Sequence, residues 1–204
     1  MNRMDRPDGL GGVLAREAHR PLHLVNIGGG PAADSLNALI LLRSTRQDLL
    51  AGRQVAISVL DVDESGPAFG LRMLGALRGR EGPLHGLDVS FSFSRYDWSR
   101  TAVLADAVAA GMSGDSAMAV SSEGGLFEYG ADEEVSANLA TLHACTPADA
   151  IVVGSATRPG PAGDVMNSSA GHRLHPRSLE AFAALCGRAG WRVERALERP
   201  LAHH

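Results

Sequence analysis

Two short runs of the chain carry residue types suited to hold a nucleoside. Gly28, Gly29 and Gly30 follow an apolar segment, and glycine lets a backbone approach a ligand closely. A helix beginning after them would offer free N–H groups and about half a positive charge to a carboxylate or phosphate. Asp61 follows the next apolar segment, and its two oxygens could accept hydrogen bonds from the vicinal hydroxyls of a ribose. Asp63 offers the same chemistry, so the choice between the two acids stays open.

A third run, Tyr96-Asp97-Trp98, adds groups that suit an adenine base. Asp97 could accept a hydrogen bond from an exocyclic amine, and Trp98 could lie against a purine face. Each residue also has a plainer interpretation: a tight turn for the glycines, solvated turn acids, and an aromatic residue at the edge of the core. The order of the three runs favours the ligand, because each one follows a separate predicted strand.

The elements that must position these residues alternate along the chain. Short β-type runs and helical patterns, separated by Gly and Pro, predict parallel βαβ units. Pro31 is expected in the first turn of a helix, Asp132 as an N-cap and Gly190 at a C-cap. The expected strands are 22–27, 55–60, 87–93, 117–120, 150–154 and 191–196, the third at a sheet edge.

The pattern as a whole predicts a single α/β domain over residues 1–204. We expect a Rossmann-like, doubly wound, mostly parallel sheet with helices on both faces. Residues 1–21 would form an N-terminal segment and residues 156–175 a long active-site loop. In such sheets a ligand lies beyond the carboxyl ends of the strands, so the loops after the first four strands should converge on one pocket.

Composition excludes several classes of protein. Of 204 residues, 45% are hydrophobic and 21% charged, which is ordinary globular composition. The net charge is −4 and the basic residues are scattered, which disfavours nucleic acid as a partner. All 19 basic residues are arginine. The missing lysine excludes a P-loop kinase and a Schiff-base enzyme.

Cysteine usage and hydropathy predict a cytoplasmic chain. Cys145 and Cys186 lie far apart on expected helices and suit small buried hydrophobes better than a disulfide. The N-terminus lacks a secretory apolar stretch, and the longest apolar run is too short to span a bilayer, so we expect no membrane association. The pair His203-His204 is left out of the predicted site, because such a pair also occurs as the remnant of an affinity tag.

Taken together, the motifs resemble those of class I S-adenosylmethionine-dependent methyltransferases of the small-molecule type. Asn26-Ile27-Gly28-Gly29-Gly30-Pro31 is similar to the first motif of that family, Leu60-Asp61-Val62-Asp63 to its ribose-binding motif, and Tyr96-Asp97-Trp98 to its adenine-contacting motif. The run from Ser121 to Gly130 resembles the motif after strand four. The resemblance covers residues 22–196.

The resemblance implies a role for each matching position. Gly28, Gly29 and Gly30 would border the methionine part of S-adenosylmethionine. The remaining cofactor positions are Asp61 and Val62 at the ribose, Asp97 and Trp98 at the adenine, Ser121 or Ser122 beneath the sulfonium, and Asn26 where the family commonly has an acid.

Two further departures from the family concern the ends of the chain. Only one strand is expected where the family's sheet usually ends in an antiparallel hairpin, and only 21 residues precede the first strand. A second subunit, or a further stretch of sequence, could complete the substrate side of the pocket; of the two, we expect a homodimer.

Methyl transfer is an in-line displacement that needs alignment and, for a hydroxyl acceptor, removal of a proton. The candidate catalytic residues are Glu123, after strand four, and His172, in the long loop; Glu128 and His175 are weaker candidates. Neither a magnesium-dependent catechol-type site nor any other metal site is expected. The expected acceptor is an oxygen or nitrogen of a small molecule, whose identity stays open.

Two other functions remain as alternatives. A protein of this fold could bind S-adenosylmethionine without transferring its methyl group. Gly28, Gly30 and Ala33 also fit the spacing of a dinucleotide fingerprint, which would indicate an NAD(P)- or FAD-binding oxidoreductase. Asp61 lies 33 residues after Gly28, however, whereas that fingerprint expects its ribose acid roughly 20 residues on.

Overall fold

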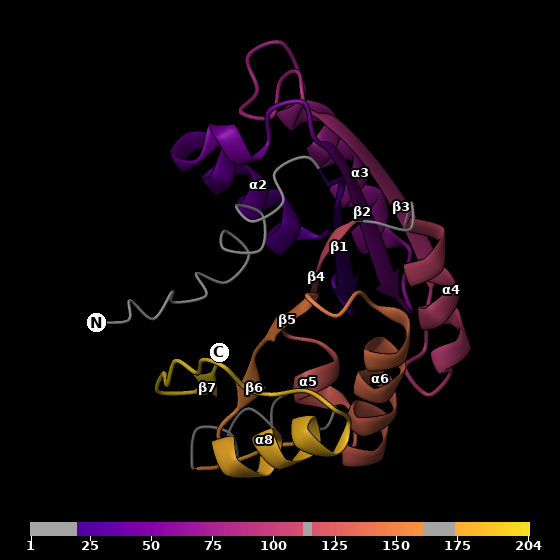
Figure 1. Cartoon of the computed structure of the whole chain (residues 1–204), viewed down its shortest axis with the longest axis vertical. Coiled ribbons are helices and arrows are strands. Elements are labelled where there is room, and N and C mark those ends of the chain that lie inside the picture. The colour runs from indigo at the N-terminus through magenta and orange to yellow at the C-terminus, as the bar shows by residue number, and fades with distance from the viewer. Residues whose placement is uncertain (1–19, 112–115, 161–173) are drawn as a thin grey trace.

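A computed structural model describes residues 20–111, 116–160 and 174–204. Its main sheet has five parallel strands in the order β3-β2-β1-β4-β5 (Figure 1). The strands are β1 (Leu22–Ile27), β2 (Gln54–Asp61), β3 (Asp88–Arg95), β4 (Ala117–Ser122) and β5 (Ile151–Gly154). The Rossmann-like prediction is therefore confirmed, with β3 at an edge as expected.

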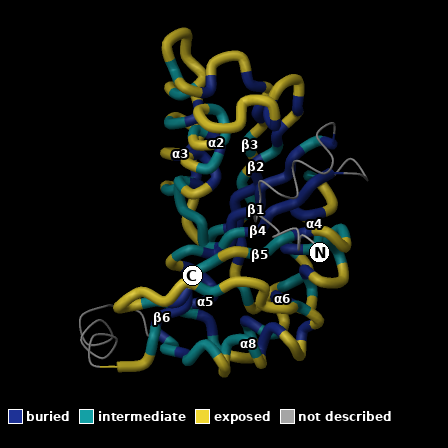
Figure 2. The backbone as a smooth tube through the Cα atoms, turned by 60° about the vertical axis from the view of Figure 1, so that its left-hand side comes forward, coloured by how far each residue is buried: buried dark blue, intermediate teal, exposed yellow. Residues whose placement is uncertain are grey.

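Helices cover both faces of this sheet, which is why β1 is buried along its whole length. One face packs against α2 (Ala33–Thr45), the 3₁₀ turn η1 (Gln47–Leu49) and α3 (Ser65–Leu77). The other face packs against α4 (Thr101–Gly111), α5 (Leu126–Tyr129), α6 (Asp132–Cys145) and α8 (Leu179–Arg188). In Figure 2 the dark blue of buried residues follows the strands.

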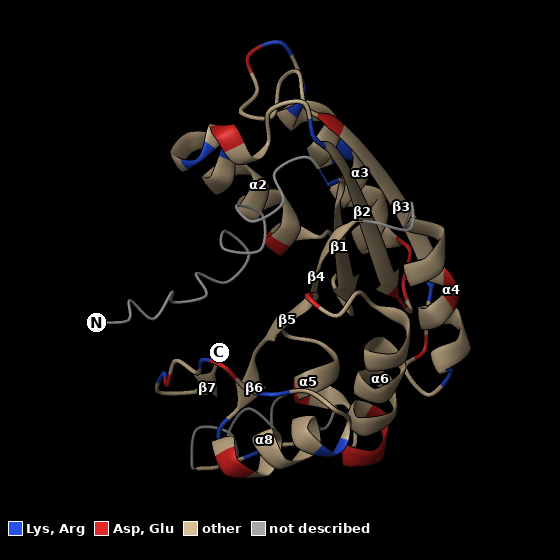
Figure 3. Ribbon diagram, viewed as in Figure 1, with Lys and Arg blue, Asp and Glu red and all other residues tan. Residues whose placement is uncertain are grey.

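The core divides along the two faces of the strands, because successive side chains of a strand point to opposite sides. Leu22 and Leu24 of β1 join the cluster under α2 and α3, whereas Val25 and Ile27 join the cluster under α4 and α6. No helix in the described part of the chain is both long and apolar enough to cross a membrane. Arginine residues are dispersed over helices and loops in Figure 3.

The C-terminal part of the chain differs from the prediction. Residues 191–196 form no strand. The helix α8 ends at Arg188 with Ala189, not the predicted Gly190, as its C-cap. Gly190 follows with φ +90°, and the Trp191 indole N–H donates to the Leu139 carbonyl of α6 at 2.8 Å. The Trp191 side chain therefore serves helix packing, and the segment that follows lies at the surface.

A second, separate sheet takes the place of that strand. The strands β6 (Ala156–Thr157) and β7 (Ala202–His203) pair antiparallel outside the main sheet. The predicted loop 156–175 therefore begins as a strand, and Leu174 at its other end is buried. Figure 1 shows the β6–β7 pair beside α5 and α8, near the C-terminus.

Two helix starts also differ from the prediction. The helix α2 begins at Ala33 rather than at Pro31, because Ala32 adopts a left-handed conformation (φ 56°) as its N-cap. Asp132 is the first residue of α6 and not its N-cap, which is Ala131. The Glu134 carboxylate accepts the Ala131 N–H at 2.8 Å instead. The Asp132 carboxylate is thereby left for a partner from another segment.

Candidate functional site

The glycine-rich loop after β1 lies where the loops after β3 and β4 also arrive. Gly28 has φ +62°, and a Cβ at this position would lie 3.1 Å from the Cα of Gly125 and 3.5 Å from the Trp98 ring. A side chain at residue 28 would therefore press on both neighbours. The structure thus brings together the first predicted motif, the aromatic residue of the third and the start of α5.

Asp61 ties the second motif to the same loop. Its Oδ2 accepts a hydrogen bond from the Gly30 N–H at 2.9 Å, and its Oδ1 accepts one from the Asp63 N–H at 3.1 Å. Each carboxylate oxygen can accept a further bond. Asp61 is half-buried at the carboxyl end of β2, beside the glycine loop, and keeps acceptor capacity for a ligand there.

Asp63 has a different role in the structure. It is exposed, and its Oδ1 accepts the Ser65 N–H at 2.6 Å at the start of α3. Hydrogen bonds with the side chain and then the backbone of Ser65 lower the pKa of the Asp63 carboxyl. Asp63 therefore acts on the helix start, which favours Asp61 as the acid for a ligand. Val62, between them, is 58% exposed and leaves an apolar surface open beside Asp61.

The loop after β3 is held by a residue that the sequence did not single out. Asn138 of α6 is fully buried, and its amide donates to the Trp98 carbonyl at 2.7 Å and to the Glu134 carbonyl at 2.8 Å. Its oxygen accepts a hydrogen bond from the buried Tyr96 hydroxyl. Asn138 lies in the middle of an amphipathic helix, 40 residues from Trp98, so no local pattern reveals its role.

Asp97 is exposed next to Trp98. Its Oδ1 accepts the Ser99 N–H at 3.0 Å, and this bond lowers the pKa of the Asp97 carboxyl. Asp97 is therefore held as an ionised acceptor at the carboxyl end of β3. Trp98 is half-buried with its ring against Gly28.

Asn26 connects β1, α2 and β4 below the glycine loop. Its amide N donates to the Ser35 hydroxyl at 2.8 Å, and its Oδ1 accepts from Ser121 at 3.2 Å. Asn26 is fully buried. An uncharged amide suits this position, because burying a carboxylate among two hydroxyls would cost more than burying an amide. Ser121 faces this network, and Ser122, as the next strand residue, points to the other face.

The loop after β4 carries the predicted catalytic acid. Ser122 is 1% exposed, and its hydroxyl has no hydrogen-bond partner among the described residues. Burial raises the pKa of the Glu123 carboxyl. A hydrogen bond with Ser155 and the charge of His204 counteract this rise, whereas repulsion from Asp34 and Glu128 adds to it. Asp34 is the second residue of α2. Its repulsion of Glu123 therefore means that Glu123 lies close to the start of the helix that follows the glycine loop.

Ser155 joins this loop to the end of β5. Its hydroxyl donates to Glu128 Oε1 at 2.7 Å and accepts the Gly124 N–H at 3.3 Å. The Glu128 carboxylate is thus partly occupied, whereas Glu123 is paired with His204, at 3.6 Å between Oε2 and Nδ1. His204 was left out of the sequence prediction, and His172, the other predicted catalytic residue, lies outside the described residues.

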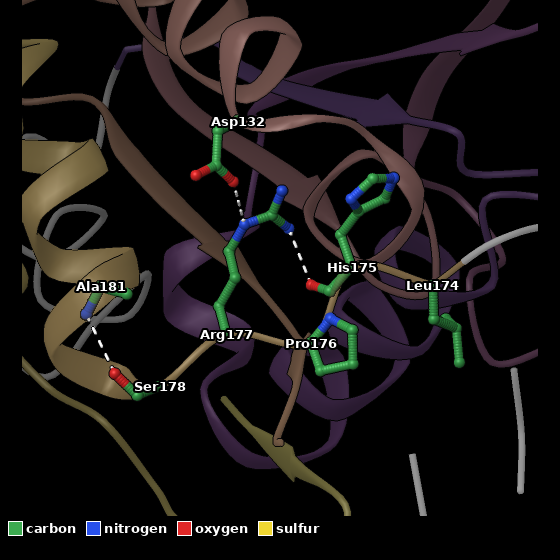
Figure 4. A pocket seen from close by; sticks show the side chains of 7 residues that line it. All are labelled: Asp132, Leu174, His175, Pro176, Arg177, Ser178 and Ala181. Carbon is green, nitrogen blue, oxygen red and sulfur yellow. Dashed lines mark hydrogen bonds and ion pairs between the residues drawn. The ribbon is translucent and has the colours of Figure 1, made fainter. Parts of the chain in front are cut away.

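A pocket apart from the predicted cofactor residues lies beside α5. An open pocket of about 400 Å³ is lined by seven residues: Asp132, Leu174, His175, Pro176, Arg177, Ser178 and Ala181 (Figure 4). None of the predicted cofactor residues lines it. The His175 N–H donates to the Glu128 carbonyl at 2.8 Å, so α5 separates this pocket from the loop after β4.

Arg177 forms one wall of this pocket and is buried (5% exposed). Its guanidinium donates to Asp132 Oδ1 at 2.8 Å, to the Phe127 carbonyl at 2.9 Å and to the Gly130 carbonyl at 2.6 Å. A guanidinium engaged in this way has a structural role, fixing α5 and the start of α6 to the segment before α8. No group of three His, Cys, Asp or Glu in the described residues is arranged to hold a metal ion.

Comparisons with known proteins bear on the fold. No family model matches the sequence, and no curated protein matches it. Among solved structures, the cyclopropane synthase MmaA2 from Mycobacterium tuberculosis is similar with a TM-score of 0.53 and 12% identity, covering 92% of this chain and 61% of that one. A possible exported protein from Bordetella parapertussis is similar with a TM-score of 0.51 and 14% identity, covering 95% and 64%.

The chain therefore spans less than two thirds of the length of either neighbour. At such identities the likeness concerns the fold alone: this chain has a mostly parallel, Rossmann-like sheet that a cyclopropane synthase shares.

Proposed function

We propose that this chain binds S-adenosylmethionine at the carboxyl edge of its sheet and transfers the methyl group to an oxygen or nitrogen of a small molecule. One observation carries the proposal. The glycine loop, Asp61 and Trp98 come from three separate strands, yet Gly30 is bonded to Asp61 and Gly28 lies against Trp98. These contacts lie beside the switch point between β1 and β4, where ligands bind in open α/β sheets.

The residues present fit the parts of the cofactor. Gly28, Gly29 and Gly30 would lie along its methionine part, and the half-buried Asp61 would accept both ribose hydroxyls. The exposed Val62 and the Trp98 ring offer apolar surface for the adenine. The exposed Asp97 carboxylate would accept the exocyclic amine of that base.

The cofactor, when bound, supplies a methyl group on a cationic sulfonium. The protein's part is to align the acceptor and to remove its proton where the acceptor is a hydroxyl. Glu123 is the described acid at this edge that could assist the proton transfer, and burial raises the pKa of its carboxyl. The scattered basic residues support a small molecule as acceptor rather than nucleic acid.

Isothermal titration calorimetry tests the cofactor directly. We expect S-adenosylhomocysteine, the demethylated product, to bind, and NADH and FAD to give no heat of binding. Binding of NADH or FAD without a response to S-adenosylhomocysteine would replace the proposal by an oxidoreductase. The binding-only alternative predicts the same titration, so it is separated by transfer of label from methyl-labelled S-adenosylmethionine to a panel of small amines, phenols and carboxylates.

The variant Asp61→Asn uses the same titration to test whether Asp61 binds the ribose. The asparagine oxygen can still accept the Gly30 N–H, so the loop keeps its anchor while the ribose loses a charged acceptor. Because a hydrogen bond to a charged group contributes roughly 1.5 to 3 kcal/mol, affinity for S-adenosylhomocysteine should fall roughly 10- to 100-fold. Asp88→Asn, at the opposite end of β3, is the matched control. An unchanged affinity would assign the ribose to Asp63 or to neither acid.

A further inference from the structure

The C-terminal segment lies against the loop that follows β4. Strand β7 pairs with β6, and the Arg158 N–H donates to the Leu201 carbonyl at 2.9 Å. The backbone of His204 is bonded twice to Leu197: its N–H donates at 3.0 Å and its carbonyl accepts at 2.6 Å. His204 is therefore held by a hairpin that is itself attached to the strand leaving β5.

This hairpin places the His204 side chain at the predicted reacting edge. His204 Nδ1 lies 3.6 Å from Glu123 Oε2, and the two side chains are 42% and 32% exposed. Both groups are thus open on one side while facing each other on the other. Since Nδ1 faces the carboxylate, Nε2 is the ring nitrogen left for a further partner.

The charges around this pair come from several elements. Burial raises the pKa of the Glu123 carboxyl, and repulsion from Asp34 of α2 and Glu128 of α5 adds to this effect. Ser155 occupies one oxygen of Glu128. On the hairpin, Glu198 is paired with Arg158 at 3.6 Å. Glu123 therefore lies among acids, and His204 is the group on the hairpin that faces it.

We propose that His204 and Glu123 form an acid–base pair facing the transferable methyl group, with His204 Nε2 taking the proton of the acceptor. This inference rests on the function proposed above. The acceptor oxygen or nitrogen would form its bond to the methyl carbon as the carbon–sulfur bond breaks, and that electron pair stays on sulfur as a thioether. The acceptor's proton moves to Nε2, and the Nδ1–H toward Glu123 stabilises the imidazolium, as in other carboxylate–histidine pairs.

Neighbouring groups suit this role less well. Glu128 has one oxygen bonded to Ser155 and its carbonyl bonded to His175, so it supports the loop. Glu123 carries the pKa raised by burial, yet its paired oxygen is directed to His204. A proton relay through the imidazole lets a half-buried carboxylate act without contacting the acceptor itself.

The test uses a pair of ligands that differ at the methyl position. Sinefungin carries an amine at this position, which is cationic at neutral pH, whereas S-adenosylhomocysteine carries no charge at this position. The ratio of their dissociation constants, measured by calorimetry from pH 5.5 to 8.5, reports the charges that face this position and cancels effects common to both ligands.

In the wild-type protein the preference for sinefungin should grow as pH rises and the His204 imidazolium loses its proton. Glu123→Gln should reduce the preference at pH 8 roughly fivefold, the magnitude of a partly exposed ion pair. His204→Gln should flatten its dependence on pH. His85→Gln and Glu133→Gln, at exposed positions elsewhere, should leave the ratio unchanged.

Circular dichroism and thermal melting establish that each variant is folded. A second readout needs no ligand: nitrogen-15 NMR should show a changed chemical shift of His204 Nδ1 in Glu123→Gln, because the group 3.6 Å away has lost its charge. If the wild-type protein binds no S-adenosylhomocysteine, the proposed function fails and the pair fails with it. If S-adenosylhomocysteine binds and the ratio is unaffected by both variants, only the acid–base pair is overturned.

Discussion

Two regions of the molecule hold their functional groups by different means. The region from β1 to α4, residues 20–111, sets its loops by strand register and by close contacts with backbone atoms. The Gly30 N–H meets Asp61, and α3 approaches so closely that a Cβ at Gly70 would lie 2.3 Å from the Pro31 carbonyl oxygen. Residues 121–204 rely instead on side chains that reach distant carbonyls. Arg177 and Asn138 both bond to backbone atoms 40 or more residues away.

The difference separates two tasks. A cofactor of fixed shape can be bound by a repeated strand–loop–helix unit, because the carboxyl ends of all the parallel strands lie at the same edge of the sheet. The acceptor side has no such rule, because its position depends on which segment happens to cover the edge. In the proposed function this role falls to α5, the β6–β7 pair and the C-terminal hairpin. The predictions below test whether the two regions depend on these different contacts.

The largest effect is expected for the side chain that holds the C-terminal region. Arg177→Leu leaves the carbonyls of Phe127 and Gly130 without their donor. At 1 to 3 kcal/mol for each, the free energy of unfolding should fall by about 4 kcal/mol in urea denaturation. Arg158→Leu removes a partly exposed pair with Glu198 and should cost less than about 1 kcal/mol. Equal losses in the two variants would contradict a special role for Arg177.

Lowering the pH should lower the stability of the first region, because His23 is buried there. This buried histidine of β1 has a pKa lowered by burial to about 4, against 6.5 for the free side chain. Between these values the unfolded chain binds more protons, so stability falls as pH falls. The cost should reach about 3 kcal/mol at pH 4.

Chemical denaturation between pH 7 and 4 measures this dependence. His23→Gln keeps a donor toward the Ser58 hydroxyl, which lies 2.8 Å from Nε2, but does not titrate. The variant should therefore lose less stability than the wild-type protein over this range. Parallel curves for the two proteins would show that His23 is not the group responsible.

A methyl group at the contact between α3 and the glycine loop tests the role of close backbone approach. Gly70→Ala would force the Pro31 carbonyl to move, and overpacking of this kind costs about 2 kcal/mol. Affinity for S-adenosylhomocysteine should fall with it, because the loop shifts. Gly75→Ala, in the same helix with open space around it, should instead raise stability by roughly 0.5 to 1 kcal/mol. If Gly70→Ala changed neither the stability nor the affinity for S-adenosylhomocysteine, the close contact between α3 and the glycine loop would not be needed to hold that loop.

The smallest effect concerns the start of α8. The Ser178 hydroxyl accepts the Ala181 N–H at 3.2 Å as the helix cap. Ser178→Ala should lower the free energy of unfolding by about 1 kcal/mol. The matched control is Ser44→Ala, whose hydroxyl bonds to a carbonyl within its own helix and should change stability by less than about 0.5 kcal/mol. A cap effect no larger than this control would show that α8 is held by packing alone.

The first region could be predicted because its signals are local. Strand β1 is buried on both faces, so it reads as a continuous apolar run, and its predicted bounds match the structure. The edge strand β3 alternates instead, with Val89 buried and Ser90 exposed. The convergence of Gly28, Asp61 and Trp98 followed from strand order in parallel sheets rather than from any one residue.

The second region could not be predicted in the same way. Residues 191–196 alternate like a strand, but no strand of the main sheet lies beside them, and Trp191 packs on α6 instead. Arg177, Asn138 and His204 have partners that are distant in sequence, and nothing near them signals those partners. A buried arginine in particular has the same local sequence context as a solvated one.

The single residue between β5 and β6 has a consequence for how such a protein could diversify. Ser155 separates a strand of the main sheet from one that leaves it, and its hydroxyl bonds to the loop after β4. The described residues after Ser155 add no strand to the main sheet, so this part can change without altering the pairing of the five strands as long as α8 keeps its packing on the core. For the proposed function, we therefore expect new substrate preferences to arise in the residues after Ser155, while the loops proposed to hold the nucleoside stay unchanged.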